Sequence, residues 1–472
     1  MSLYKRTHGE EQPYWPLGPF KIRIPLVHYR LEIPEIIQGF VMFVVGLGLI
    51  PLIEVHLGLP FEIALAYAVM FQVVMLMALF LGVPMFPGFI TAGVPIVVIF
   101  LGNYEPGPEA IQAMFALQIV VFLIMAILGV TGWGSKLVSS LPRSITAGVL
   151  LGAGIAAILG EVTEGGAALE TPISVIAGAF LSFIFLFSLS FRRLAQKNKF
   201  ARLISSYGLI PPMLIAIGVG WATREYALPN VECCIAKPDF VGMWNHTPFV
   251  LGVPSLEVFL LAIPTAVITY IIAFGDMVVG TELNKTANEV RTDEKIDTSL
   301  SRLHLVTGLR NLVLAFFSPH PGLAGPIWTA GHASVMERYK QGRKAMDSVY
   351  GGHGSMMLAF MIGIFILPLI SIFQPVLPIA LALTLILTGY VTITVGMAQI
   401  SNPTQYGVAG VTAVVLASHG AVAGLVTGVV LYLALERLPV FGKLSSSKGS
   451  RATSRSEKET LLESEHVGAS DK

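Results

Sequence analysis

Long apolar runs are the feature that most restricts how this chain can fold. They recur from Ile36 to Leu435, and a run of about 20 such residues is what an α-helix needs to cross the hydrocarbon core of a bilayer. Hydrophobic residues make up 54% of the chain and charged residues 12%, against about 25% charged residues in soluble domains. Backbone inside lipid must hydrogen-bond to itself, so these runs are predicted to form helices. The sequence indicates an all-α polytopic membrane protein.

We predict 14 spans in two series of seven. The first series covers residues 35–223, the second covers residues 254–437, and a polar loop at 224–253 separates them. A charged, amphipathic segment, residues 1–34, comes first, and a Ser-rich charged tail, residues 438–472, is expected to be disordered. The spans are expected at about residues 35–57, 60–82, 87–101, 109–131, 142–160, 172–191, 207–223, 255–281, 303–318, 326–338, 354–373, 376–398, 404–418 and 420–437.

The placement of Lys and Arg supports this count, because cytoplasmic loops concentrate basic residues. With an even number of spans both termini lie on one side, and all of the 30 Lys and Arg residues except Arg224, Lys237 and Arg310 fall on that side. Both termini are therefore predicted to be cytoplasmic. Because seven is odd, the second series must be inverted relative to the first, which is the usual architecture of secondary transporters.

The third span of each series is interrupted in similar chemistry. Residues 87–97 read PGFITAGVPIV and residues 325–335 read GPIWTAGHASV, so each passes from Pro and Gly into Thr-Ala-Gly. A broken helix exposes backbone N–H groups and a positive dipole end. In lipid each exposed group costs on the order of several kcal/mol, unless the break lines a protein-walled cavity.

We expect the short pieces 88–90 and 326–328 to pair as strands, and two helices starting near Thr91 and Thr329 to point at one site. Such a site suits an anion or the acceptor-rich edge of a polar heterocycle. The alternative is a pair of Pro kinks between packed helices. The candidate ligand groups at the breaks are Phe89, Ile90, Thr91, Trp328, Thr329, Ala330 and Gly331. Trp328 could stack on a flat ligand or serve only in packing.

Asp276 is a carboxylate inside a predicted span, which by default suggests a function. Helical spacing places it on one face with Thr269 and Gly280, and it could bind a substrate N–H, carry a proton or ligate a cation. The alternative is a helix cap or an ion pair near the helix end, with Lys285 or Arg310 as partner.

Several other polar groups lie in predicted spans. His332, one turn inside the second half-helix, could carry a proton or donate to substrate, or could be a structural hydrogen-bonding group. Tyr390 could reach the site or only pack. Gln38 and Gln72 are polar at depth, and either could bridge helices.

Other classes of site have no support in the sequence. Cys233 and Cys234 are adjacent, so a structural disulfide is not expected, and no metal-ligand spacing is present. HExxH, GxSxG and P-loop patterns are absent, so we expect neither an enzyme nor a cofactor. No basic stripe with interleaved aromatic residues suggests nucleic-acid binding.

The pattern resembles the superfamily of nucleobase–ascorbate permeases, sulfate permeases and bicarbonate-type anion exchangers. The resemblance covers residues 35–437 and is mainly architectural, and it is nearest to a bacterial family linked to purine uptake. The residues that carry it are IPLVHYRLEIPEIIQGF in span 1, LPRSITAGVLLGAGI in span 5 and GPIWTAGHASVMERYK in span 10. It implies a bacterial inner-membrane homodimer. It also implies a core domain of spans 1–4 and 8–11 that moves against a gate domain of spans 5–7 and 12–14.

The chain departs from nucleobase permeases at both ligand positions. Their span 8 carries Glu-x-x-Gly-Asp/His, and here IAFGD places Ile272 where the Glu would be, while Gly275 and Asp276 match. Their span 10 has a Glu or Gln nine residues before an Arg, and counting back from Arg338 reaches Thr329. Both acidic or amide ligands are thus replaced.

The leading hypothesis is a secondary active transporter that imports purine nucleobases, coupled to H⁺ or Na⁺ through Asp276 or His332. The alternative is a transporter of inorganic or carboxylate anions, similar to sulfate permeases, in which the two positive helix ends bind the substrate. A channel or receptor is a third class, and it predicts conductance or binding without concentrative uptake. The missing acidic ligands favour the anion, whereas Trp328 and Asp276 favour the nucleobase.

Overall fold

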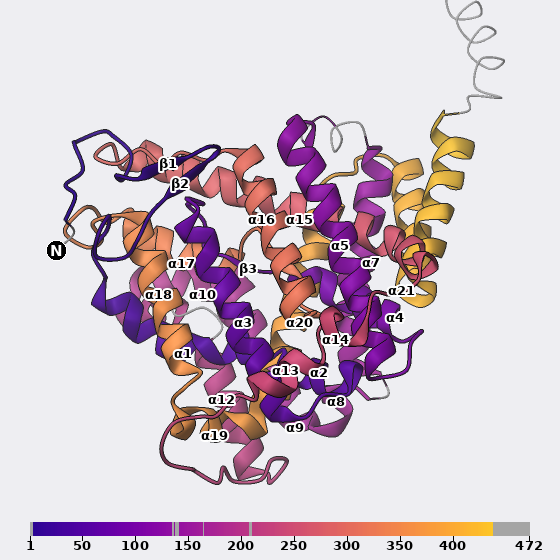
Figure 1. Cartoon of the computed structure of the whole chain (residues 1–472), viewed down its shortest axis with the longest axis horizontal. Coiled ribbons are helices and arrows are strands. Elements are labelled where there is room, and N and C mark those ends of the chain that lie inside the picture. The colour runs from indigo at the N-terminus through magenta and orange to yellow at the C-terminus, as the bar shows by residue number, and fades with distance from the viewer. Residues whose placement is uncertain (1–2, 135, 137–140, 164, 207–209, 438–472) are drawn as a thin grey trace, which may run out of the picture.

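The computed structural model describes residues 3–134, 136, 141–163, 165–206 and 210–437 (Figure 1). The predicted disordered tail lies outside the described residues. The first half contains α1 (Ile33–Leu47), α2 (Ile50–Leu57), α3 (Phe61–Phe80), the 3₁₀ turn η1 (Thr91–Gly93), α4 (Val94–Leu101), α5 (Pro108–Thr131), α7 (Arg143–Val162), α8 (Ala167–Glu170), α9 (Pro172–Phe187), α10 (Leu189–Lys197), α11 (Lys199–Ser206) and α12 (Ile210–Ala222).

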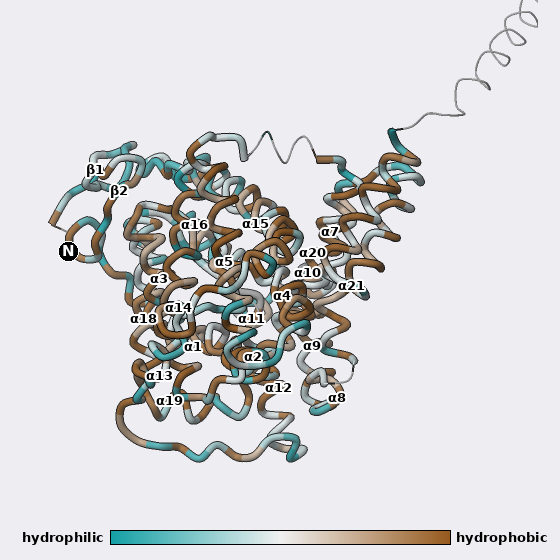
Figure 2. Tube along the Cα trace, turned by 45° about the vertical axis from the view of Figure 1, so that its right-hand side comes forward, coloured by the Kyte–Doolittle hydropathy of each residue, from teal (hydrophilic) through white to brown (hydrophobic). Residues whose placement is uncertain are grey.

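The second half repeats the helical character of the first. It contains α13 (Phe240–Asn245), α14 (Pro248–Leu251), α15 (Leu256–Val290), α16 (Leu300–Phe317), α17 (Thr329–Tyr339), α18 (Val349–Gly363), α19 (Leu367–Phe373), the 3₁₀ turn η2 (Gln374–Val376), α20 (Leu377–Met397), α21 (Pro403–Leu431) and the π-helical turn η3 (Tyr432–Arg437). Figure 2 shows hydrophobic residues along these helices and hydrophilic residues gathered in the N-terminal segment. The prediction of an all-helical polytopic membrane protein is confirmed.

Six helices of the described chain are long and apolar enough to cross a membrane, or seven if the bent pair α9 and α10 is one span. Other apolar helices are shorter, including Thr91–Leu101 at the first break. The long helix α21 contains a kink at Gly420, whose φ of 82° favours glycine, and this is where spans 13 and 14 were expected to meet. The count of 14 spans stays a prediction.

The helices pack in two groups. In one group α1 and α3 contact α18, while α5 contacts α15 and α16. In the other group α7 contacts α20 and α21, and α9 contacts α12 and α20. Figure 1 places α1, α3 and α18 toward one end of the long axis and α7 and α21 toward the other. Movement of a core domain against a gate domain stays a prediction.

Two short strands pair where the two breaks meet. Strand β3 (Gly88–Phe89) is antiparallel to β4 (Ala324–Gly325), with Gly88 opposite Gly325. The expected pairing of the breaks is therefore confirmed, but the expected position of the second strand at 326–328 is wrong by about two residues. The reason is Pro326, which has no N–H to donate and so ends the ladder. Beyond it, Trp328 N–H donates to the carbonyl of Phe86 at 2.8 Å.

The N-terminal segment forms a folded cap rather than a loose amphipathic stretch. Its hairpin, β1 (Trp15–Leu17) with β2 (Phe20–Ile22), precedes α1. Arg6, only 6% exposed, pairs with Asp293 at 2.9 Å and with Glu294 at 3.5 Å, both in the connection between α15 and α16. Lys21 pairs with Asp297 of the same connection at 2.6 Å. These contacts tie the first residues of the chain to the second half.

The charge of Asp293 is held by two guanidinium groups. Its hydrogen bonds from Arg291, with help from Arg6, lower its pKa from 3.8 to about 2. Because the folded-state pKa is depressed, this ion pair stabilises the fold above pH 3.8 and that contribution is lost as the pH falls toward 2.

Replacing Arg6 by Ala should lower the free energy of unfolding by about 3 kcal/mol, because Glu294 would be left buried without its cation. The measurement is thermal unfolding in detergent, followed by tryptophan fluorescence. Lys5→Ala is the matched control, since Lys5 is exposed and should leave the Tm unchanged. An equal Tm for the two variants would contradict the role given to Arg6.

Candidate functional site

The two half-helices begin beside the paired strands. In the half-helix that begins at Thr91, the first N–H along the chain to donate within the turn is that of Gly93, which bonds to Ile90 O at 2.9 Å. In the second, the N–H of His332 bonds to Trp328 O at 2.9 Å. The preceding N–H groups, among them Thr91 and Thr329, have no acceptor in the described part of the chain, as expected for helix starts. Both positive helix ends are therefore available to a ligand.

Ile90 differs from its neighbours in this respect. Its N–H donates to the carbonyls of Gly322 and Leu323, at 3.1 and 3.2 Å. That bond extends the contact between the two breaks, so the Ile90 N–H serves the strand pair and is not free to bind a ligand.

Side chains of α16 satisfy the carbonyls of the strand pair. Arg310 donates to Gly325 O at 2.7 Å and to Gly88 O at 3.2 Å, so one guanidinium bridges both strands. Asn311 donates to Ala324 O at 2.8 Å and accepts the Ala324 N–H at 2.9 Å. We call Arg310 and Asn311 the α16 clamp. Sequence reasoning missed it, and the available signal was an adjacent Arg and Asn inside an apolar helix.

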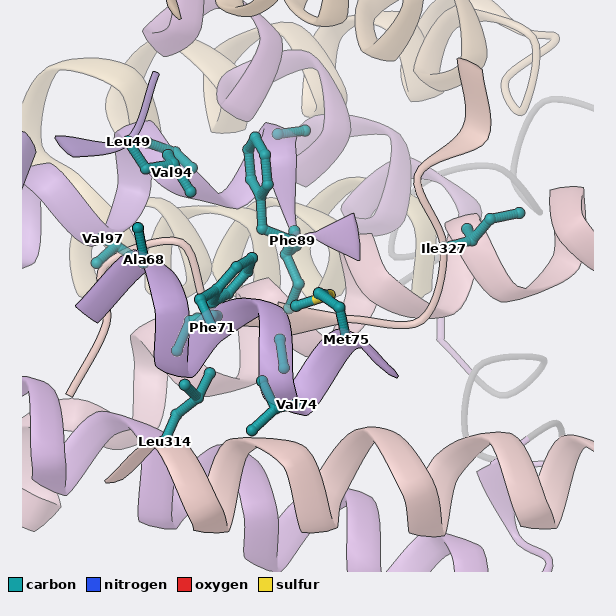
Figure 3. Packing of buried hydrophobic residues seen from close by; sticks show 14 of the residues in the cluster. Leu49, Ala68, Phe71, Val74, Met75, Phe89, Val94, Val97, Leu314 and Ile327 are labelled. Carbon is teal, nitrogen blue, oxygen red and sulfur yellow. The ribbon is translucent and has the colours of Figure 1, made fainter. Parts of the chain in front are cut away.

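A small pocket lies against the strand pair, between α1, α3 and α18. Its volume is about 20 Å³, room for about one water molecule. Figure 3 shows Phe71 and Met75 of α3 beside Phe89 of β3. The lining residues are Gly46, Phe71, Gln72, Met75, Phe86, Pro87, Gly88, Phe89, Trp328, Met357 and Phe360. We call this the break pocket.

Gln72 is the polar side chain of the break pocket. It comes from α3, is 4% exposed, and its amide oxygen has no hydrogen-bond partner in the described chain. A buried amide oxygen without a donor is costly unless a ligand or water supplies one. Our sequence reasoning noted Gln72 only as polar at depth and did not select it as a site residue.

The charge beside the break pocket is positive. Arg310 is 1% exposed, and its Nη2 atom contacts the sulfur of Met75, which lines the pocket. None of the described carboxylates forms an ion pair with Arg310, its Nε atom has no partner, and no carboxylate lines the pocket. The guanidinium and the two helix ends therefore act on the pocket with the same sign.

Asp276 lies on the face of α15 that packs against both breaks. On that face, Thr269 contacts Gly93, and Gly280 contacts Ile327. Asp276 itself is half-buried, forms no hydrogen bond or ion pair with the described residues, and does not line the break pocket. The alternative of an ion pair with Lys285 or Arg310 is wrong, because Lys285 pairs with Glu282 and Arg310 binds backbone carbonyls.

Of the remaining residues that the sequence suggested for the site, one lines the break pocket and another bridges two helices beside it. Trp328 lines the break pocket and its ring packs against Phe86 and Phe360, at centroid distances of 5.6 and 6.3 Å. Gln38 donates to Ser334 at 2.9 Å and so bridges α1 to α17.

Other candidates do not line the pocket. The Thr269 hydroxyl donates to the carbonyl of Thr265 in its own helix at 3.0 Å. Tyr390, 41% exposed, packs on Phe187 of α9 at 4.6 Å. His332 is fully buried behind Phe86, whose N–H donates to its Nδ1 at 3.3 Å. In the described part of the chain no group of three or more His, Cys, Asp or Glu could hold a metal ion.

No protein-family model matches this chain, and no curated protein matches it. Solved structures do match. The chain is similar to the murine Solute Carrier 26 family member A9 (Slc26a9) anion transporter in its inward-facing state, with 14% identity, 86% of this chain and 68% of that chain covered, and a TM-score of 0.50. It is also similar to the transmembrane domain of a cyanobacterium bicarbonate transporter, BicA, with 13% identity, coverages of 84% and 96%, and a TM-score of 0.47. The likeness to the murine protein shows a shared fold.

Gly325→Ala should destabilise the site, because a Cβ there would lie 2.7 Å from the backbone carbon of Phe89. Overpacking of this kind costs about 1–3 kcal/mol, which thermal unfolding in detergent would report. Gly275→Ala is the matched control on α15, where an added Cβ meets nothing within 4 Å. If the two variants unfold at the same temperature, the close crossing of β3 and β4 is not a constraint on this fold.

Proposed function

We propose that this protein is a secondary active transporter that moves a small inorganic or carboxylate anion across a bacterial inner membrane. In this proposal the anion binds between the two half-helix starts, and a core domain moves against a gate domain to expose it to either side. A homodimer, coupling to H⁺ or Na⁺ and cytoplasmic termini remain part of the proposal. The purine nucleobase of the leading sequence hypothesis gives way to its alternative.

The observation that carries the proposal is the charge of Arg310. A buried cation without a counterion is expensive, since the desolvation penalty amounts to several kcal/mol. Here only backbone carbonyls and a thioether offset it. An anion in the break pocket would supply the missing counter-charge, and it would do so where two helix ends also attract it.

The chemistry of the pocket points the same way. Its space of about 20 Å³ holds about one water molecule, so the pocket must widen for an oxyanion as well as for a purine, and chemistry rather than size separates the two. A purine site also needs acceptors for ring N–H groups, yet the pocket offers one amide, Gln72, and no carboxylate. The shared fold with a solved anion transporter supports the anion class.

Uptake into proteoliposomes separates the two substrate classes. We expect radiolabelled sulfate, bicarbonate or a small carboxylate to accumulate, and unlabelled anions to compete with it. Adenine, guanine and uracil should not compete. Accumulation of a purine that anions fail to inhibit would overturn the proposal.

Gln72→Glu tests the sign of charge that the pocket accepts. A carboxylate at this position would repel an anion and neutralise the field of Arg310, so anion uptake should fall about tenfold or more, since loss of a charge-assisted hydrogen bond alone is worth about 1.5–3 kcal/mol. Gln405→Glu, in the first turn of α21, is the matched control and should transport like the parent. A nucleobase site would tolerate the acid at residue 72, because a carboxylate accepts hydrogen bonds from ring N–H groups.

A further inference from the structure

Two histidines form a buried pair behind the break pocket. His332 of α17 and His353 of α18 are both fully buried. His332 Nδ1 lies 3.1 Å from His353 Nε2, and the ring centroids are 5.0 Å apart. We propose that this pair binds the proton that is carried together with the anion, a step that rests on the proposed function.

The hydrogen-bond donors around the pair fix its protonation. The N–H of Phe86 can only donate, so His332 Nδ1 is an acceptor and its ring hydrogen lies on Nε2. His353 Nε2 faces the same acceptor and must supply a hydrogen to it. The neutral pair therefore leaves His353 Nδ1 as an unprotonated nitrogen, and neither this atom nor His332 Nε2 has a partner in the described chain.

A proton has a defined place in this arrangement. It would add to the lone pair of His353 Nδ1, with no other bond formed or broken. The contact from His353 Nε2 to His332 Nδ1 would become charge-assisted and therefore stronger. Two imidazoles would then share one positive charge, and loss of the proton from the same atom would restore the neutral pair.

Phe86 connects the pair to the break pocket. Its ring lines the pocket and packs edge-on against His353 at 5.6 Å. Its N–H binds His332, and its carbonyl accepts the N–H of Trp328, which also lines the pocket. A charge on the pair would thus lie one residue behind the anion. An anion would favour protonation and a proton would favour the anion by the same factor.

The other ionisable groups near the pair are accounted for. Glu35 of α1 pairs with Arg338 of α17. The hydroxyl of Tyr350 in α18 donates to Gly82 O at 3.1 Å, and the ring of Tyr29 packs on Tyr350 at 6.3 Å. Tyr67 of α3 is buried. Asp276, in the middle of α15, forms no hydrogen bond or ion pair with the described residues, so it is the competing proton carrier.

The test is sulfate uptake into proteoliposomes with and without an inward proton gradient. The parent protein should gain about fivefold or more from the gradient, the lower end of typical coupling between sites. His353→Gln should import sulfate at a rate that the gradient does not change, and His332→Gln should do the same. His419→Gln, an exposed control in α21, should keep the full response.

The possible results separate the two claims. Sulfate uptake in the parent that ignores the gradient would overturn the histidine pair and leave the proposed function standing. A response lost in Asp276→Asn but kept in both histidine variants would assign the proton to Asp276 instead. Failure of the parent to import sulfate or any other small anion would remove both claims. Thermal unfolding of each variant, and the parent's own response, keep the test valid if one histidine variant does not fold.

Discussion

Backbone that leaves its helix inside a membrane must find hydrogen-bond partners, and here the α16 clamp supplies them. Arg310 bridges the carbonyls of Gly88 and Gly325, and Asn311 binds both polar groups of Ala324. With those groups satisfied, two antiparallel strands can be as short as two residues each. The N–H groups at the starts of the two half-helices are then not needed to satisfy the carbonyls of the break, and they can bind a ligand.

The α16 clamp also makes the electrostatic potential at the site positive. A neutral donor could have satisfied the two carbonyls, but Arg310 also introduces a buried cation next to Met75 and Gly88 of the break pocket. Pocket charge and fold stability thus depend on one side chain. In the proposed mechanism, the histidine pair gains a second positive charge when it binds a proton. Phe86 connects this pair to the site, because its N–H binds His332 and its side chain lines the break pocket. In the same proposed mechanism, the fixed charge of Arg310 selects the anion and the titratable histidine pair couples its movement to a proton.

Sequence reasoning found what depends on local pattern and missed what depends on distant partners. The paired breaks follow from Pro-Gly leading into Thr-Ala-Gly, and Trp328, a candidate for stacking on a ligand or for packing, lines the break pocket. The predicted position of the second strand is wrong by about two residues, because Pro326 has no N–H to donate and ends the ladder. Arg310 could not be assigned, because its partner Gly88 is 222 positions away. Tyr390 faces α9 and packs on Phe187, whereas Gln38 bridges α1 to α17 through Ser334, which is the second of the roles that the sequence left open.

The central claim is that an anion sits between the two half-helix starts, held by the charge of Arg310. Locating selenate by its anomalous scattering in crystals of the protein tests this most directly. The account predicts a peak at the break pocket, within reach of the Thr91 and Thr329 N–H groups and of Gln72. A pocket that excludes selenate while binding a purine in the same position would contradict it.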